Sequence, residues 1–187
     1  MQHQIYPDMG TSASILTNKE NTIKTTFRNM YEFECYDSKD NLKWKETVFN
    51  IVVDEGLDEI LNQFYKGSAY TASHYVGLTD STPTVAAGDT MSSHAGWAEV
   101  YTEYTEATRE ALTLGSVSAK SVDNSASKAS FTINAAATIG GAFVTTDNTK
   151  NGTSGILIGV ADFAAADRVV ADGDTLNVTV TLTAATA

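Results

Sequence analysis

DEGLDEILNQFYKG, residues 54–67, is the one segment of this chain with a clear helical pattern. Four apolar residues recur in it with helical spacing: Leu57, Ile60, Leu61 and Phe64. They would form one stripe along about three turns, with Asp54 capping the first turn and Gly67 ending the last. We therefore predict a helix over residues 55–66 whose apolar stripe packs on the core. On this interpretation, Leu61→Asp would unfold the domain, because it places a charge in the core.

The segment before the helix predicts a β-hairpin. Tyr31, Phe33 and Cys35 alternate with glutamates in YEFEC, residues 31–35, and LKWKE, residues 42–46, alternates in the same way. A four-residue loop over 37–40 would place Glu34 opposite Lys43, Glu32 opposite Lys45, and Phe33 opposite Trp44. The apolar run at 48–53 is expected to enter the core before the helix begins.

After residue 67 the chain is rich in Ala, Thr, Ser and Gly, with short β-branched runs between turn residues. This texture is typical of a sandwich or barrel of short strands. The clearest strand has Leu176, Val178, Val180 and Leu182 on one face. Strands are expected near residues 74–79, 97–104, 110–119, 128–134, 138–146, 155–161 and 175–183. The predicted fold is mainly β: an antiparallel β-sandwich, jelly-roll-like, with an N-terminal hairpin and one short α-helix, forming a single domain over 29–187.

Composition excludes several classes of partner. The net charge is −11, with 12 Lys and Arg against 23 Asp and Glu and no basic stripe, so direct nucleic-acid binding is not expected. No apolar run is long enough to span a membrane, and the first residues lack the order of a signal peptide. The single cysteine, Cys35, excludes an intrachain disulfide and is expected to be a small core residue. The fold would therefore suit a reducing cytoplasm.

No motif in the chain predicts chemistry. His74 and His94 lack the spacing of a helical metal site, and Ser92-Ser93-His94 lacks the context of a hydrolase triad. Gly88-Asp89 and Gly173-Asp174 are typical of turns, and Gly140-Gly141 of a close approach within a sheet. We therefore expect no catalytic residue, no cofactor-binding residue and no metal ligand, and the protein is not expected to be an enzyme.

Residues 1–28 are polar with thinly spread apolar residues and no period. They are interpreted either as a frayed terminus or as an extended N-terminal arm that becomes ordered on a neighbouring subunit. In the second case, the partner contacts would be Ile5, Tyr6, Ile15, Leu16 and Ile23.

Three blocks carry a family resemblance: YVGLTDSTPTVAAGDTMSSHAGWAEV at 75–100, KASFTINAAATIGGAFVTTDNTKNGTSGILIG at 128–159, and DGDTLNVTVTLTA at 172–184. Over residues 30–183 the chain resembles small virion structural proteins of tailed bacteriophages, of the capsid decoration or cement type. The resemblance implies a non-enzymatic protein, made in the host bacterial cytoplasm, that binds the outer surface of the phage capsid and stabilises it. Its partners would be the major capsid protein and further copies of itself, as a trimer or dimer.

Similar β-rich modules also serve elsewhere in virions, so a tail, neck or fibre module that binds host glycan is the alternative. Such a module would present exposed aromatic side chains, and the candidates are Trp97, Tyr101 and Tyr104.

Overall fold

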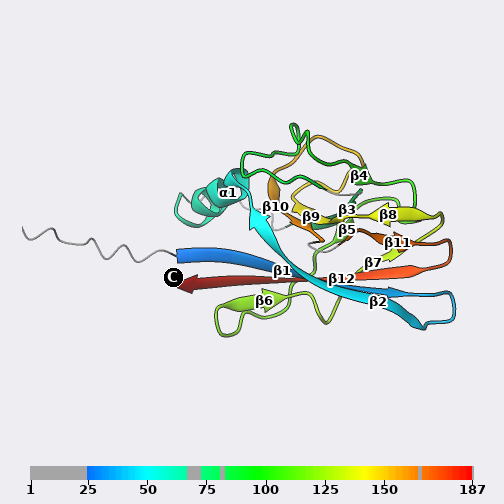
Figure 1. The fold of residues 1–187 in the computed structure, drawn as a ribbon. Coiled ribbons are helices and arrows are strands. Elements are labelled where there is room, and N and C mark those ends of the chain that lie inside the picture. Colours follow the sequence, from blue (N-terminus) through cyan, green and yellow to red (C-terminus); the bar gives the residue numbers. More distant parts are fainter. Residues whose placement is uncertain (1–24, 67–72, 81–82, 164–165, 187) are drawn as a thin grey trace, which may run out of the picture.

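The computed structural model describes residues 25–66, 73–80, 83–163 and 166–186. A ten-stranded antiparallel sheet folds into two layers, with the helix α1 (Asp54–Phe64) at one end (Figure 1). The protein is therefore an antiparallel β-sandwich with an N-terminal hairpin and one helix, as predicted. The strands are β1 (Thr25–Tyr36), β2 (Leu42–Val52), β3 (Tyr75–Thr79), β4 (Glu99–Val100), β5 (Glu110–Ala111), β6 (Ser121–Asp123), β7 (Ala129–Thr132), β8 (Ala137–Ile139), β9 (Gly141–Thr145), β10 (Leu157–Asp162), β11 (Arg168–Val170) and β12 (Thr175–Thr186).

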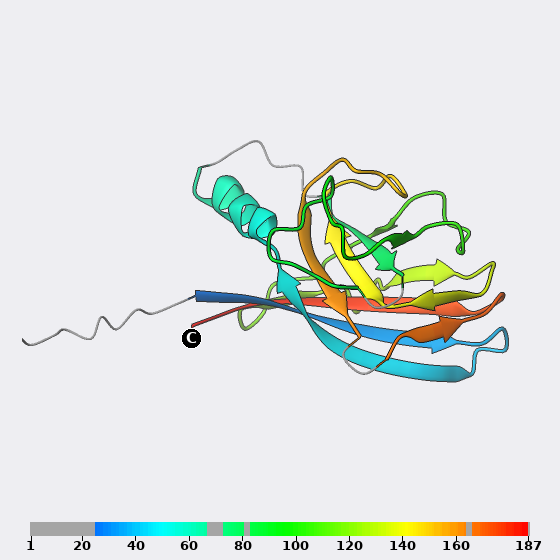
Figure 2. The ribbon, with the colours of Figure 1, turned by 45° about the horizontal axis from the view of Figure 1, so that its top comes forward.

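Strand β2 belongs to both layers. Its residues 42–49 pair with β1, whereas residues 50–52 pair with β10. On one side of this corner, β1 pairs with β12 along its whole length; on the other, β10 leads to β9 and β3 (Figure 2). A separate two-stranded sheet joins β8 and β11. The hydrophobic core lies between the two layers.

The alternation predicted for the long strands is confirmed. Fully or almost fully buried side chains come from β1, from β7 and the residue after it, and from β12: Tyr31, Phe33, Cys35, Ala129, Phe131, Ile133, Leu176, Val178 and Val180. Because these strands keep a period of two, their other residues face outward.

The predicted register of the hairpin is wrong, by two residues along most of the ladder and by one residue next to the turn. Glu34 pairs with Lys45 and Cys35 with Trp44, but Tyr36 pairs with Leu42, so Lys43 is the extra residue of a β-bulge. The bulge directs Lys43 to the buried carboxylate of Asp174, with which it forms an ion pair. A regular ladder, as the sequence predicted, has no place for this contact.

The apolar run after this hairpin is only half buried. Val48 and Val53 lie in the core, whereas Phe49 is 61% exposed and Ile51 is also exposed. The expectation that residues 48–53 enter the core as a whole is wrong, because β2 keeps its alternation and turns every second side chain to the outside.

The helix forms where predicted, but of its predicted core-facing stripe only Ile60 is partly buried. Leu57, Leu61 and Phe64 face outward, with Leu61 53% and Phe64 79% exposed. The buried residue is Gly56, where an added Cβ would lie only 2.4 Å from the backbone oxygen of Ile158 in β10. The helix is therefore held by close backbone approach, because a glycine allows α1 to lie directly on β10.

Other boundaries also differ from the predictions. The expected strands at 97–104 and 110–119 shrink to β4 and β5, because their remaining residues form turns and loops. Strands β6 and β11 were not predicted. Strand β1 begins at Thr25, so residues 25–28, expected in the arm, belong to the sheet. The helix begins with Val53 as its N-cap, without a side-chain cap from Asp54.

A buried ion pair connects β4, the residue before β5 and the loop between β9 and β10. The guanidinium of Arg109 donates from Nε and Nη2 to the Glu99 carboxylate, at 3.0 and 2.7 Å. It also donates to the carbonyl oxygens of Asp147 and Gly152, at 2.9 and 3.0 Å. The Arg109 side chain is fully buried and the Glu99 side chain is 4% exposed, so each charge depends on the other.

The Asn124 side chain completes the outer side of β12. Strand β7 covers residues 175–178 of β12 and β6 covers residues 181–183. Between them, Val180 N donates to the Asn124 side-chain oxygen at 2.7 Å, and the Asn124 amide donates to Val178 O at 3.2 Å. The Asn124 side-chain amide thus forms the two hydrogen bonds that the backbone of a neighbouring strand would otherwise form with β12.

Candidate functional site

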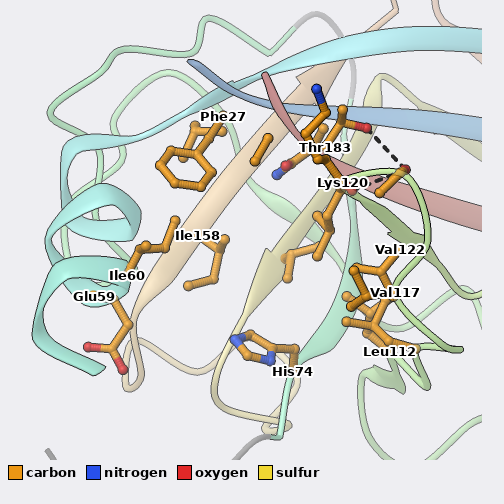
Figure 3. Close-up of a pocket in the computed structure, with 17 residues that line it drawn as sticks. Phe27, Glu59, Ile60, His74, Leu112, Val117, Lys120, Val122, Ile158 and Thr183 are labelled. Carbon is orange, nitrogen blue, oxygen red and sulfur yellow. Dashed lines mark hydrogen bonds between the residues drawn. The ribbon is translucent and has the colours of Figure 1, made fainter. Parts of the chain in front are cut away.

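An apolar pocket of about 480 Å³ opens between α1, the start of β1 and the end of β12 (Figure 3). Phe27 of β1 and Ile60 of α1 form one side, and Ile158 of β10 lies between them and the interior. Leu112 and Val122 line the opposite side. The pocket is the open end of the sandwich core, which the helix covers only in part because it is docked through Gly56.

A tight turn builds the wall opposite the helix. Ser118 and Ser121 exchange backbone hydrogen bonds of 2.9 and 2.8 Å around Ala119 and Lys120, both of which have positive φ. This is the geometry of a two-residue hairpin turn in which both central residues are left-handed. The Ser121 hydroxyl donates a hydrogen bond of 3.3 Å to Leu182 O in β12. The wall is therefore a fixed part of the sheet.

The buried polar side chain of the lining is Asn29 of β1, and further polar groups lie at the rim. Glu59 of α1, His74 before β3 and Lys120 of the turn stand around the apolar interior (Figure 3). Burial lowers the pKa of His74, and the Glu59 carboxylate opposes that shift. Burial therefore favours the neutral form of the His74 imidazole. The other two groups at the rim are the acidic Glu59 and the basic Lys120.

A second feature is the exposed apolar surface of β2 and α1, formed by Phe49, Ile51, Leu57, Leu61, Phe64 and Tyr65. Strand β2 runs directly into α1 at the end of the sandwich (Figures 1 and 2). The Phe64 and Tyr65 rings meet edge to face with centroids 5.1 Å apart, and Arg28 lies over the Phe49 ring. We call these six residues the β2–α1 surface. Grouped exposed apolar side chains of this kind mark contact sites.

The structure gives structural roles to several residues considered for chemistry. His94 stacks on Trp97 with ring centroids 3.8 Å apart, and its Nδ1 lies 3.1 Å from Trp97 O. Asp89 accepts hydrogen bonds from Ala86 N and from the Trp97 indole, and Asp174 accepts one from Ala171 N. The interpretation of Asp89 and Asp174 as turn residues is confirmed.

Among the described residues, no three His, Cys, Asp or Glu side chains gather closely enough to hold a metal ion. In the same part of the chain, no helix combines the length and the apolar character that a membrane crossing requires.

The predicted partner contacts Ile5, Tyr6, Ile15, Leu16 and Ile23 lie outside the described residues. Of the aromatic residues considered for glycan binding, Trp97 and Tyr104 are buried, and Tyr101 is 37% exposed. Trp97 and Tyr104 therefore offer no platform on the surface.

Sequence reasoning missed both the pocket and the β2–α1 surface. Leu112 and Val117 were expected within one strand, and no periodicity in that segment signals a pocket wall. For the β2–α1 surface the sequence did contain a signal. Gly56, a residue that allows close backbone approach, stands next to Leu57 in the first turn of the helix. The chain shows no significant match to protein-family models, curated proteins or solved structures.

Proposed function

We propose that this chain is a non-enzymatic virion structural protein that binds the outer surface of a tailed-phage capsid and stabilises it. The observation that carries the proposal is the β2–α1 surface, six large apolar side chains that are exposed to solvent. Burying one leucine or phenylalanine side chain contributes about 1.5–3 kcal/mol. Several such contacts per copy, repeated over a lattice, give a stable coat even when each copy binds modestly.

Two further features agree with the proposal. The family resemblance in the sequence is to decoration proteins, and a net charge of −11 suits a protein that stays soluble until it meets a capsid. The same charge disfavours nucleic acid as a direct partner. The partners proposed are the major capsid protein and further copies of this chain.

The copy number of the chain in purified virions tests the proposed location. Quantitative mass spectrometry against the most abundant capsid protein is expected to give a ratio near one, or a simple fraction such as one third, because a decoration protein follows the lattice symmetry. A few copies per particle would instead place the chain in the tail, neck or fibres. Its absence from virions would overturn a structural role altogether.

Leu61→Asp tests the contact surface. Because Leu61 is 53% exposed, the variant is expected to fold, with its free energy of unfolding changed by less than about 1 kcal/mol. Its affinity for capsids that lack the protein should fall at least tenfold, since a charge would be buried in the contact.

Val169→Asp is the matched control for this variant. Val169 is also an apolar residue with an exposed side chain, at 63%, but it lies on β11 and not on the β2–α1 surface. It should keep both the fold and capsid affinity. Equal affinity of the Leu61→Asp and wild-type proteins would show that the β2–α1 surface is not the contact.

A further inference from the structure

The apolar pocket is large enough, and its lining apolar enough, to receive apolar side chains from another segment. Its volume of about 480 Å³ would hold roughly sixteen water molecules at about 30 Å³ each. Phe27, Ile60 and Ile158 offer water no hydrogen bonds, whereas the buried Asn29 amide, which also lines the pocket, can form them. A pair of branched apolar side chains would occupy part of this space and displace water from it.

The chain itself carries a segment of matching chemistry. Twenty-four residues precede β1, and they contain the adjacent apolar residues Ile15 and Leu16. Phe27, the third residue of β1, already lines the pocket, so this segment is joined to the molecule at the pocket rim. Leu16 lies nine positions before Thr25, a span that reaches about 30 Å when extended.

The path of β1 favours a pocket on another molecule. Thr25 pairs with Thr186, so β1 is held extended up to its first residue (Figures 1 and 2). The pocket lies near this end of β1, because Phe27 lines it. To fill its own pocket, the segment would have to reverse tightly across Phe27. A second copy's segment enters without this reversal, and the exchange can be reciprocal between identical copies.

Charges around the two elements are complementary. Lys19 and Glu20 follow the apolar pair within four residues, and the pocket rim carries Glu59 and Lys120. An entering segment can therefore place each of its charges near one of opposite sign.

We infer that the apolar pocket of one molecule receives the Ile15-Leu16 pair of a second copy's N-terminal segment. This contact links copies of the chain to one another and is independent of capsid binding. The contact has two sides: an apolar pocket with Glu59 and Lys120 at its rim, and the branched apolar pair Ile15-Leu16.

Disulfide trapping between two differently labelled full-length chains tests the inference. One chain carries Leu16→Cys, and the other carries Val117→Cys at the pocket, where Val117 is 75% exposed. The native Cys35 does not compete, because burial beside the Asp174 carboxylate raises the pKa of its thiol to about 12. The mixed disulfide is expected to form at least tenfold faster than with Val169→Cys, an exposed control position on β11.

Three results would overturn the inference. The first is equal trapping rates at Val117→Cys and Val169→Cys. The second is a disulfide that forms only within one chain carrying both Leu16→Cys and Val117→Cys, which would assign the pocket to the molecule's own segment. The third is a tightly held acyl chain found by native mass spectrometry, which would make the occupant a lipid. Sedimentation gives an independent check, because Leu16→Asp should shift the protein from oligomer to monomer at equal concentration.

Discussion

Replacing Arg109 with leucine is expected to lower the free energy of unfolding by about 3–5 kcal/mol. The substitution leaves the Glu99 carboxylate almost completely buried without its cationic partner. It also removes the donors that hold the carbonyl oxygens of Asp147 and Gly152, so the loop between β9 and β10 loses its anchor. Urea unfolding followed by far-ultraviolet circular dichroism measures the change.

Arg168→Leu is the control for this prediction. Arg168 also pairs with a glutamate, Glu46, but its side chain is 33% exposed. Solvated ion pairs contribute little, so the loss should stay below about 1 kcal/mol. Replacing Glu99 together with Arg109 by leucine should recover much of the stability, because no charge then remains buried alone. Similar losses for Arg109→Leu and Arg168→Leu would contradict the assignment of a desolvated pair.

Phe143→Ala is expected to cost about 3–5 kcal/mol. The Phe143 ring is fully buried, lies 5.1 Å from the Trp97 ring, and carries the Arg109 guanidinium at 5.1 Å from its centroid. Opposite it in β3 is Gly77, where an added Cβ would come within 2.3 Å of the ring. The ring thus lies directly on the β3 backbone, and its removal leaves a space that neighbouring side chains cannot fill.

The exposed Phe64 provides the comparison. Phe64→Ala removes the same atoms from a side chain that is 79% exposed, and should change stability by less than about 0.5 kcal/mol. Thermal unfolding of the two variants side by side separates the effects. Losses for Phe143→Ala and Arg109→Leu should not add in the double variant, since the two side chains are in contact. Strict additivity would show that the contact stabilises neither residue.

The sequence predicted the strands in which one face is buried along the whole element. Leu176, Val178 and Val180 alternate with polar residues because β12 is covered by the core on one side. Such a pattern predicts both the strand and which of its faces is buried. Short strands such as β4 and β5 carry no pattern of their own, because long-range partners define them.

The helix shows where periodicity fails. An apolar stripe predicts a helix, and α1 is one, but the stripe alone does not state whether it faces the core or a partner. Gly56 determines which face of α1 packs on the sheet, because only a residue without a side chain allows α1 to approach β10 as closely as it does. The candidate contact surface was therefore present in the sequence as the predicted core face of the helix.

The hairpin register was missed for a different reason. The charge pairing of Glu34 with Lys45 fits the sheet, and Lys45 lies 3.2 Å from the Glu34 carboxylate. The bulge at Lys43 depends on Asp174, which is remote in sequence. A local pattern contains no information on such a partner.

Asn124 has a consequence for the behaviour of the protein at high concentration. A long unpaired strand edge is a template for aggregation, because another chain can add to it as a further strand. With Asn124 filling the gap between β6 and β7, β12 offers no such template there, and the outermost strands of the ten-stranded sheet, β4, β5, β6 and β7, are two to four residues long. Addition of another chain to this edge of β12 as a further strand is therefore disfavoured.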